Sequence, residues 1–388
     1  MLIEELKNCS GCHACFSVCA KSAILMEENY EGFLYPVIDK EKCVECGLCE
    51  KVCPSIEPLK KENENTKSFA AINKNEKIRL DSSSGGIFSA IAEKVIDEGG
   101  IVFGAKFAED FSVVHGWAET KEDIAEFRGS KYLQSVIGNS YKDCKNFLLT
   151  DRKVIFSGTP CQIQGLKKYL GKEYDNLITV DFICHGVPSP SLWKKYIEYR
   201  EKKSASRTVK TAFRRKNDGW KQFSVSFTFA NDTEYCASLK KDSYIQIFLK
   251  DIALRDSCYE CSCRGITRPS DITLADFWGI QYVLPEMDDD KGTSFVVCNS
   301  KKGLELFEKN LLDKCTIREV NINDGIKYNI SILTSPIRPP KRRCFYHDLN
   351  ILNFNKMIMK YANTSFFIYV FRFIKKCYRK ILRILNRK

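Results

Sequence analysis

Two cysteine runs of identical spacing lie within the first sixty residues. They are Cys9-x-x-Cys12-x-x-Cys15-x-x-x-Cys19 and Cys43-x-x-Cys46-x-x-Cys49-x-x-x-Cys53, the second followed by Pro54. Spacers of two residues let three thiolates of one run face three irons of one cubane, and the longer spacer carries the fourth cysteine away from them. The runs therefore predict two [4Fe–4S] clusters that exchange their fourth ligands.

This spacing is that of bacterial-type ferredoxins, and it predicts a ferredoxin-type domain over residues 1–58. In the crossed arrangement the first cluster takes Cys9, Cys12, Cys15 and Cys53, and the second takes Cys43, Cys46, Cys49 and Cys19. Residues 23–26 and 32–38, between the runs, predict a two-stranded ribbon. The alternatives are zinc ribbons or buried thiols, but zinc sites usually carry two Cys-x-x-Cys pairs instead of two runs of four.

Cysteine is frequent along the rest of the chain as well, with 19 cysteines against four histidines in 388 residues. The first residues contain acids where a signal peptide would have a basic start and an apolar core, so export is not expected. No run of about 18 uncharged apolar residues predicts a membrane span. Cysteines in a reducing compartment favour metal or redox chemistry over disulfides, which predicts a cytoplasmic protein.

Charge is distributed unevenly along the chain. Residues 1–58 hold ten acids and five bases, a net charge of −5, whereas residues 364–388 hold eight bases and no acid. The remaining positive charge comes mostly from scattered lysines, so we expect no nucleic-acid partner.

A larger domain is expected over residues 68–345, after a charged linker at 58–67. Its apolar segments switch between the periods of strands and helices, which predicts a mixed α/β or α+β fold. Strands are expected at 69–72, 101–107, 113–117, 153–156, 177–183, 209–213, 223–229, 271–276 and 294–299, and helices at 87–95, 162–170 and 192–203.

The sequence Ser82-Ser83-Ser84-Gly85-Gly86 precedes the first of these helices. Small residues let backbone N–H groups approach an anion, and the helix start adds its positive end, so the loop is a candidate phosphate cradle. The same pattern is also a common helix N-cap, and it is neither a P-loop nor GxGxxG. Both interpretations stay open.

Four further motifs lie mostly where a strand ends and a helix begins, the edge at which open α/β sheets bind ligands. They are Arg128-Gly129-Ser130-Lys131-Tyr132; Ser157-Gly158-Thr159-Pro160-Cys161-Gln162; Cys184-His185-Gly186-Val187-Pro188-Ser189; and Cys258-Tyr259-Glu260-Cys261 followed by Ser270-Asp271-Ile272-Thr273-Leu274-Ala275-Asp276-Phe277-Trp278-Gly279. In this order they resemble the coenzyme F-420 hydrogenase/dehydrogenase beta-subunit family, in its form with an N-terminal ferredoxin domain. The resemblance extends to about residue 345, with Ala275 where glycine is common.

The resemblance implies an iron–sulfur flavoprotein. FAD is the usual catalytic cofactor of the family. The flavin takes electrons singly from clusters and passes them on as hydride. Members include deazaflavin reductases, reductases of plant pigments, and bacterial proteins often associated with surface-polysaccharide synthesis. Carried onto this chain, the resemblance implies flavin contacts around Ser84, Gly85, Gly86, Ser130, Lys131 and Thr159. Lys131 would balance the charge of a pyrophosphate or a reduced flavin, and its alternative is a solvated surface lysine.

Four cysteines outside the ferredoxin runs fall in family-like motifs, namely Cys161, Cys184, Cys258 and Cys261. Thiolates from three loops could hold a third [4Fe–4S] cluster between the ferredoxin clusters and the flavin, with Cys263 as a nearby candidate. The alternative for Cys161 and Cys184 is a buried apolar role, and the alternative for the other two is a zinc site.

His185 and Asp276 are the candidate catalytic residues. His185, the only histidine in a motif, could donate a proton or a hydrogen bond to flavin or substrate, or be structural. Asp276 and the two aromatic residues after it could shape a flavin or substrate wall, or belong to the core. Residues 214–216, Arg-Arg-Lys, would favour a phosphorylated substrate if they lined a pocket, although such residues more often form a solvated face.

These features together predict an oxidoreductase that takes electrons from a reduced ferredoxin or a partner subunit and delivers hydride to a small organic acceptor. The acceptor would be deazaflavin (coenzyme F-420) or, in polysaccharide assembly, a sugar-nucleotide or lipid-linked intermediate. One alternative to this oxidoreductase is a non-enzymatic electron-transfer subunit, which would have no substrate site beside the flavin. Another alternative is a scaffold protein, which would use its clusters only to hold the fold.

The final segment, residues 364–388, carries apolar residues at steps of three and four, with eight bases on much of the opposite arc. This pattern predicts a basic amphipathic helix. Such a helix would either bind an anionic surface at the inner face of the membrane or pack on protein.

Overall fold

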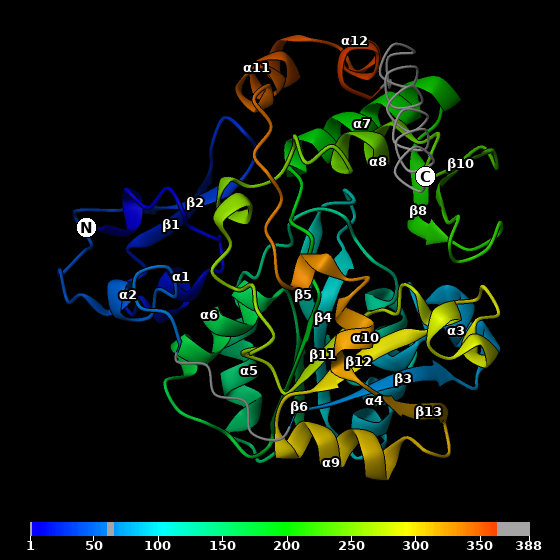
Figure 1. The fold of residues 1–388 in the computed structure, drawn as a ribbon. Helices are drawn as coiled ribbons and strands as arrows, with labels where there is room; N and C mark the ends of the chain where they lie inside the picture. Colours follow the sequence, from blue (N-terminus) through cyan, green and yellow to red (C-terminus); the bar gives the residue numbers. More distant parts are fainter. Residues whose placement is uncertain (1, 60–65, 363–388) are drawn as a thin grey trace, which may run out of the picture.

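The computed structural model describes residues 2–59 and 66–362. The amphipathic helix predicted at 364–388 lies outside the described residues. Within them, no helix combines the length and the apolar character needed to cross a membrane. The chain forms a small N-terminal module, an eight-stranded sheet with helices on both faces, and a lobe built on a three-stranded sheet (Figure 1).

The N-terminal module holds both cysteine runs. Its elements are η1 (Leu2–Glu4), α1 (Ala14–Val18), β1 (Ile24–Glu28), β2 (Leu34–Ile38) and α2 (Leu48–Lys51). Strands β1 and β2 pair antiparallel, so the predicted ribbon is confirmed. The module has its own small apolar core around Ile3, Ile24 and Ile38.

The large sheet has the strand order β13-β3-β12-β11-β7-β6-β4-β5. Its strands are β3 (Lys67–Asn73), β4 (Ile101–Phe107), β5 (Val113–Ala118), β6 (Val154–Ser157), β7 (Leu177–Phe182), β11 (Ile272–Asp276), β12 (Ser294–Cys298) and β13 (Cys315–Val320). The central strands β4, β6, β7 and β11 run parallel, and every other neighbouring pair is antiparallel. The predicted mixed α/β architecture is therefore confirmed.

Alternating side chains of the central strands enter two separate cores. Ile101 and Phe103 of β4 pack with α5 (Ser140–Leu148) and α6 (Pro160–Leu170), whereas Val102 faces α4 (Ile87–Asp97) and α9 (Lys301–Asn310). Successive residues of a strand point to opposite faces of the sheet, and here both sets are apolar. A sheet that is covered by helices on both faces requires this pattern. Smaller elements of this domain are α3 (Glu76–Asp81), η2 (Asp123–Phe127), η4 (Ile280–Tyr282), η5 (Pro285–Met287) and α10 (Ile322–Ile326).

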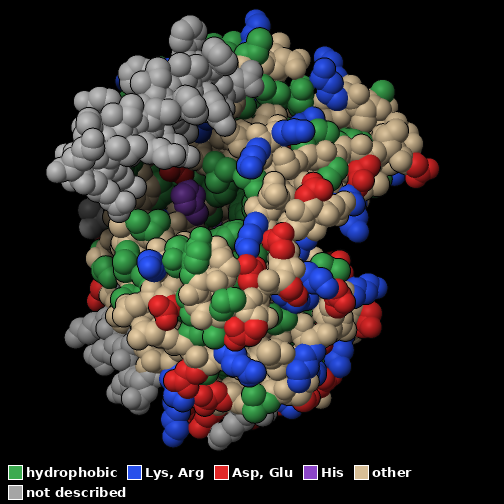
Figure 2. Space-filling model, turned by 45° about the vertical axis from the view of Figure 1, so that its right-hand side comes forward, with side chains coloured by type: hydrophobic (Ala, Val, Ile, Leu, Met, Phe, Trp, Pro, Cys, Tyr) green, Lys and Arg blue, Asp and Glu red, His purple; other side chains and the backbone are tan. Residues whose placement is uncertain are grey.

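The upper lobe in Figure 1 contains β8 (Thr208–Arg215), β9 (Ser224–Phe229), β10 (Glu234–Ser238), α7 (Pro190–Ser204), α8 (Ser243–Phe248), η3 (Asp256–Glu260), α11 (Arg342–Ile351), α12 (Phe354–Met357) and the π-helical turn η7 (Ile358–Ala362). The turn η6 (Ile330–Ile332) lies below it, beside the large sheet. Its core is aromatic, with Trp193, Phe213, Phe227 and Tyr244 fully buried. Figure 2 shows a face of the molecule that is hollowed between this lobe and the sheet domain.

The parallel strands end at the positions that the motifs mark. Strand β6 leads into α6 through Thr159, β7 leads into the Cys184–Ser189 loop, and β11 ends at Asp276. Ala275 pairs with Phe295 inside β11, so its backbone is extended and a glycine is not needed there. The motif residues therefore gather at one edge of the sheet, as the sequence predicts.

Candidate iron–sulfur and cofactor site

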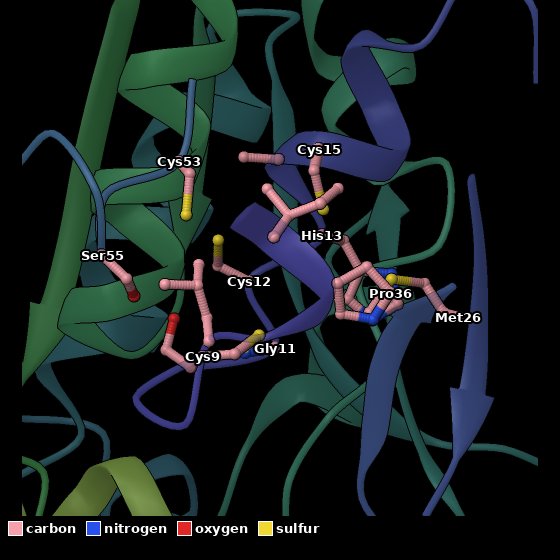
Figure 3. A pocket seen from close by; sticks show the side chains of 13 residues that line it. Cys9, Gly11, Cys12, His13, Cys15, Met26, Pro36, Cys53 and Ser55 are labelled. Atoms are coloured by element: carbon pink, nitrogen blue, oxygen red, sulfur yellow. Dashed lines mark hydrogen bonds between the residues drawn. The ribbon is translucent and has the colours of Figure 1, made fainter. Parts of the chain in front are cut away.

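Four cysteines of the N-terminal module line one pocket (Figure 3). They are Cys9, Cys12, Cys15 and Cys53, and the rest of the lining includes the apolar side chains of Ile3, Leu6 and Met26. Three of these cysteines come from the first run and one comes from the second. This is the grouping predicted for two clusters that exchange their fourth ligands. Figure 3 shows the sulfurs of Cys12 and Cys53 pointing toward one another. The residues present thus fit a [4Fe–4S] cluster, and ligation itself stays a prediction.

The thiols in this pocket are buried and close together. Burial raises the pKa of Cys12 to about 12, and repulsion from Cys9, Cys161 and Cys53 contributes to this rise. Iron binding must therefore expel protons from these thiols, which makes cluster assembly easier at higher pH. The backbone N–H of Gly11 donates to the Cys9 sulfur at 3.4 Å.

The second ferredoxin set is closer to solvent. Cys19, Cys43 and Cys49 pack in the small core of the module, whereas Cys46 is exposed. The backbone N–H of Ala23 donates to the Cys19 sulfur at 3.3 Å. A cluster held by these residues would lie at the outer end of the module.

Helix α6 meets the first cysteine pocket at a glycine. A Cβ atom on Gly165 would lie 2.9 Å from the Cys12 Cβ and 3.0 Å from its sulfur, so only glycine lets the helix approach this closely. Cys161 stands one turn earlier on the same face of α6. This contact places a body cysteine beside the first ferredoxin pocket.

The other body cysteines come from two loops that pair with each other. The N–H of Arg255 donates to the Val187 carbonyl at 2.9 Å, and Pro188 bridges to Leu254. A Cβ atom on Gly186 would lie 3.4 Å from the Cys258 Cβ. These contacts hold the loop after β7 against the loop that carries η3.

The thiols of Cys161, Cys184, Cys258 and Cys261 interact electrostatically as a group. Burial raises the pKa of Cys184, and repulsion from the other three raises it further. Burial likewise raises the pKa of Cys258 to about 12, with added repulsion from Cys161 and Cys261. In the described ranges, no three His, Cys, Asp or Glu side chains are grouped to hold a single metal ion. Thiolates around a cubane are spaced more widely than that because each binds a different iron.

The pKa of Cys261 is lowered, whereas the pKa values of Cys184 and Cys258 are raised. A hydrogen bond from the Cys263 thiol lowers the pKa of Cys261 to about 6, against the effect of burial, and Arg264 contributes to the lowering. Cys263 is buried beside it, as its position two residues further along the chain suggests.

We expect iodoacetamide to modify Cys261 before Cys258 in the cluster-free protein at pH 7. The thiolate is the nucleophile, and a pKa of about 6 leaves Cys261 mostly ionised at pH 7, while Cys258 stays protonated. The rate at Cys261 should fall below pH 6 and level off above it. Peptide mapping by mass spectrometry measures both sites, and equal labelling at pH 7 would contradict the assignment.

Residues 129–136 connect the serine loop to the cysteines. At one end the backbone N–H of Ser130 donates to Ser83 Oγ at 2.6 Å. At the other end Gln134 donates to the Ser10 carbonyl at 2.9 Å, and Ser135 Oγ accepts from the Gln162 side chain. The structure thereby brings the predicted flavin-contact motifs into one continuous region.

The predicted flavin residues have definite structural partners. A Cβ atom on Gly85 would lie 2.4 Å from the Ala71 carbonyl, so this glycine is required for packing against β3. Gly86 has φ +81° and forms the N-cap of α4. The Lys131 ammonium donates to three backbone carbonyls near η2, which rules out the solvated surface lysine as its description. Thr159 caps α6 and contacts the Cys161 sulfur at 3.1 Å.

Arg214 is buried, contrary to the expectation of a solvated basic face. Its Nη1 donates to Asp276 at 2.5 Å, while its Nε and Nη2 find no hydrogen-bond partner in the described part of the chain. The other carboxylate oxygen of Asp276 accepts from the Trp220 indole at 2.9 Å, so Asp276 positions Arg214. Lys216 reaches the Ser84 carbonyl at 2.8 Å, and burial lowers its pKa to about 7. Arg215 instead pairs with Glu234 at the surface.

His185 lies beside the body cysteines and makes two polar side-chain contacts. Its Nε2 is 2.5 Å from Asp251 Oδ1, and its Nδ1 is 3.3 Å from Ser331 Oγ. Arg264 fixes the backbone on both sides by donating to the carbonyls of Cys184 and His185. The ring is thus oriented, and a catalytic role for it stays a prediction.

Comparison with known proteins identifies the parts of the chain. Residues 68–140 match the N-terminal part of the family described as coenzyme F420 hydrogenase/dehydrogenase, beta subunit, and residues 151–323 match its C-terminal part. Residues 8–56 match a 4Fe-4S dicluster domain, which supports the predicted ferredoxin clusters.

Individual relatives are distant. An uncharacterised protein of Methanocaldococcus jannaschii is 23% identical over 83% of this chain and 91% of its own length. Coenzyme F420-dependent sulfite reductase of the same organism is 26% identical over 41% of this chain and only 25% of the reductase. A chain of the F420-reducing [NiFe] hydrogenase complex from Methanosarcina barkeri aligns with a TM-score of 0.48 and 17% identity, over 70% of this chain and 93% of that chain.

The two family matches together span most of the large domain, in the order that the sequence motifs predict. The chain therefore belongs to the coenzyme F420 hydrogenase/dehydrogenase beta-subunit family, in a form with an N-terminal 4Fe-4S dicluster domain.

Proposed function

We propose that this chain is an iron–sulfur flavoprotein oxidoreductase that passes electrons from two ferredoxin-type clusters, through a third [4Fe–4S] cluster and FAD, to a small organic acceptor. The observation that carries the proposal is the gathering of Cys161, Cys184, Cys258 and Cys261 beside the first ferredoxin pocket. The proposal divides the chain into a ferredoxin-type domain at 1–58 and a flavin-binding domain at 68–345.

The third cluster is supported by where its four cysteines originate. Cys161 follows β6, Cys184 follows β7, and the other two lie at η3, so three separate segments converge on one place. Buried apolar cysteines need no such convergence. Deprotonation of these thiols would place negative charges close together, and bound iron would compensate those charges.

The flavin site is supported by the region between Ser83 and Arg214. Tyr132 lies between them, near enough to both Ser130 and Arg214 for each to affect the pKa of its phenol, which burial raises. A buried guanidinium with two nitrogens unpaired within the described residues favours an anionic partner, such as a phosphate or the ring of a reduced flavin. A bound flavin would accept electrons singly and release them in pairs.

Anaerobic purification followed by iron, sulfide and flavin quantitation tests the proposal. About twelve irons and one FAD per chain are expected for three clusters and a flavin. About eight irons without flavin would overturn both the third cluster and the flavin, and would leave a non-enzymatic electron-transfer subunit.

Replacement Arg214→Met is expected to lower flavin retention about tenfold or more while leaving iron content unchanged. Methionine keeps most of the volume but removes the buried charge that the anion would pair with. Arg215→Met, at the neighbouring position where the side chain reaches the surface, is the matched control and should retain flavin. Flavin absorbance after gel filtration measures the effect, and full retention in Arg214→Met would remove this residue from the site.

The donor is proposed to be a reduced ferredoxin or a partner subunit. Coenzyme F420 is proposed as the acceptor because the family description names it, and a polysaccharide intermediate rests on the family resemblance alone. His185 would supply a proton or hydrogen bond near the flavin, and Asp276 would act by holding Arg214. Peripheral attachment through residues 364–388 likewise rests on the sequence pattern.

A further inference from the structure

Arg255 is a fully buried side chain that joins the N-terminal module to the body. Its Nε donates to the Cys9 carbonyl at 2.7 Å, and its Nη2 donates to the Leu34 carbonyl at 3.0 Å. Its Nη1 donates to Gln134 Oε1 at 2.9 Å. One guanidinium therefore binds the loop of the first ferredoxin pocket, strand β2 and the body at the same time.

The same guanidinium reaches a cluster-ligand sulfur. Arg255 Nη2 donates to the Cys9 Sγ at 3.7 Å, which is within the range of a hydrogen bond to sulfur. Gly11 makes the approach possible, because a Cβ atom there would lie 2.8 Å from Arg255 Nη1. The positive charge of Arg255 is thus fixed against the edge of the first ferredoxin pocket.

Arg255 has no carboxylate among its hydrogen-bond partners in residues 2–59 and 66–362. Its acceptors are carbonyl oxygens, an amide oxygen and the Cys9 sulfur, and its face lies 4.2 Å from the centre of the Tyr35 ring. A buried charge without an anionic partner is costly. The thiolates of the first cluster are the anionic group placed to compensate it.

The backbone of Arg255 extends the connection to the body cysteines. Its N–H is bound by the loop of Cys184, and it stands three residues before Cys258. Burial raises the pKa of Cys161 and of Cys258, and the charge of Arg255 offsets part of both shifts.

We propose that Arg255 sets the reduction potential of the first ferredoxin cluster. Reduction of a [4Fe–4S] cluster adds one electron from an external reductant and therefore one unit of negative charge, with no bond made or broken. A fixed cation with a hydrogen bond to a ligand sulfur stabilises the more negative state, so it raises the potential. The proposal needs only the ferredoxin-type clusters and is independent of the third cluster and the flavin.

Redox titration of the anaerobically purified holoprotein, followed by EPR, tests the proposal with dithionite as reductant. The signal of the first cluster is assigned as the one altered in Cys9→Ser. Arg255→Gln should shift that signal to lower potential by about tenfold in the reduced-to-oxidised ratio, or about 59 mV for a one-electron couple. Arg255→Lys, which keeps the charge, should shift it less, and the second cluster should not move.

Two further variants complete the design. Arg338→Gln is the matched control, since this nearby arginine pairs with Asp256 at the surface and should leave every potential unchanged. Gln134→Glu places a carboxylate against Arg255 without removing it, so it should also lower the potential of the first cluster. If the Arg255→Gln protein loses the first cluster, the potential measured in the Gln134→Glu protein tests the proposal in its place. An unchanged potential in Arg255→Gln, or in Gln134→Glu with full iron, would overturn the proposal.

Discussion

Purified Cys161→Ser protein is expected to contain about four irons fewer than the wild type, the content of one [4Fe–4S] cluster. Serine is a poor iron ligand, and the three remaining thiols are expected to be too few to retain the cluster through purification. The EPR signals of the two ferredoxin clusters should remain, because none of their eight cysteines is altered. Electron transfer from those clusters to the flavin should fall steeply.

Cys144→Ser is the matched control for this experiment. Cys144 is fully buried between α5 and the sheet, in the same core as α6, but it is not among the body cysteines that interact with one another. It should keep the full iron content. Unchanged iron in Cys161→Ser, or equal losses in both variants, would remove Cys161 from the ligand set.

Glu31→Gln is expected to destabilise the docking of the N-terminal module by about 3 kcal/mol, the lower end of the cost of breaking a buried ion pair. Glu31 is 4% exposed, and both of its carboxylate oxygens accept from Arg342 of α11, at 2.6 and 2.5 Å. The change leaves the Arg342 charge buried, with Asp256 at 3.5 Å and the Leu254 carbonyl still beside it. Hydrogen exchange at the turn between β1 and β2 should rise accordingly.

Two variants separate this charge effect from simple loss of a contact. Glu28→Gln alters a carboxylate in the same module that accepts from Ser191 at the surface, and it should leave exchange unchanged. The double variant Glu31→Gln/Arg342→Met removes the unpaired charge as well and should recover part of the protection. Protection equal to the wild type in Glu31→Gln would show that the pair does not hold the module.

The predictable parts of this molecule are those in which one sequence pattern recurs over several residues. The cysteine spacing predicts which four cysteines share a pocket, and the continuous apolar runs predict the buried central strands such as β4 and β6. Strands β10 and β13 escaped prediction because they lie at sheet edges and mix polar with apolar residues, few of them buried, as in Glu234–Ser238. Edge strands need only one apolar face, so their sequence pattern is weak.

The contacts between the module and the body were not predictable. Arg255, Gln134 and Glu31 are single polar residues in loops, and nothing in their spacing distinguishes them from solvated residues. Arg214 illustrates the same limit, since a pattern of three consecutive basic residues suggests a surface, whereas one of them is buried against Asp276 and the rings of Phe223 and Trp278. Burial of a charge is decided by tertiary partners far away in the sequence.

The pair between Glu31 and Arg342 also has a consequence for synthesis. Its members are 311 residues apart, so the ribosome must synthesise the chain through Arg342 before α11 can bind the module. Domains fold as they emerge, which lets the N-terminal module close around its own apolar core long before then. The module can therefore fold before the contact with α11 that holds it to the body is able to form.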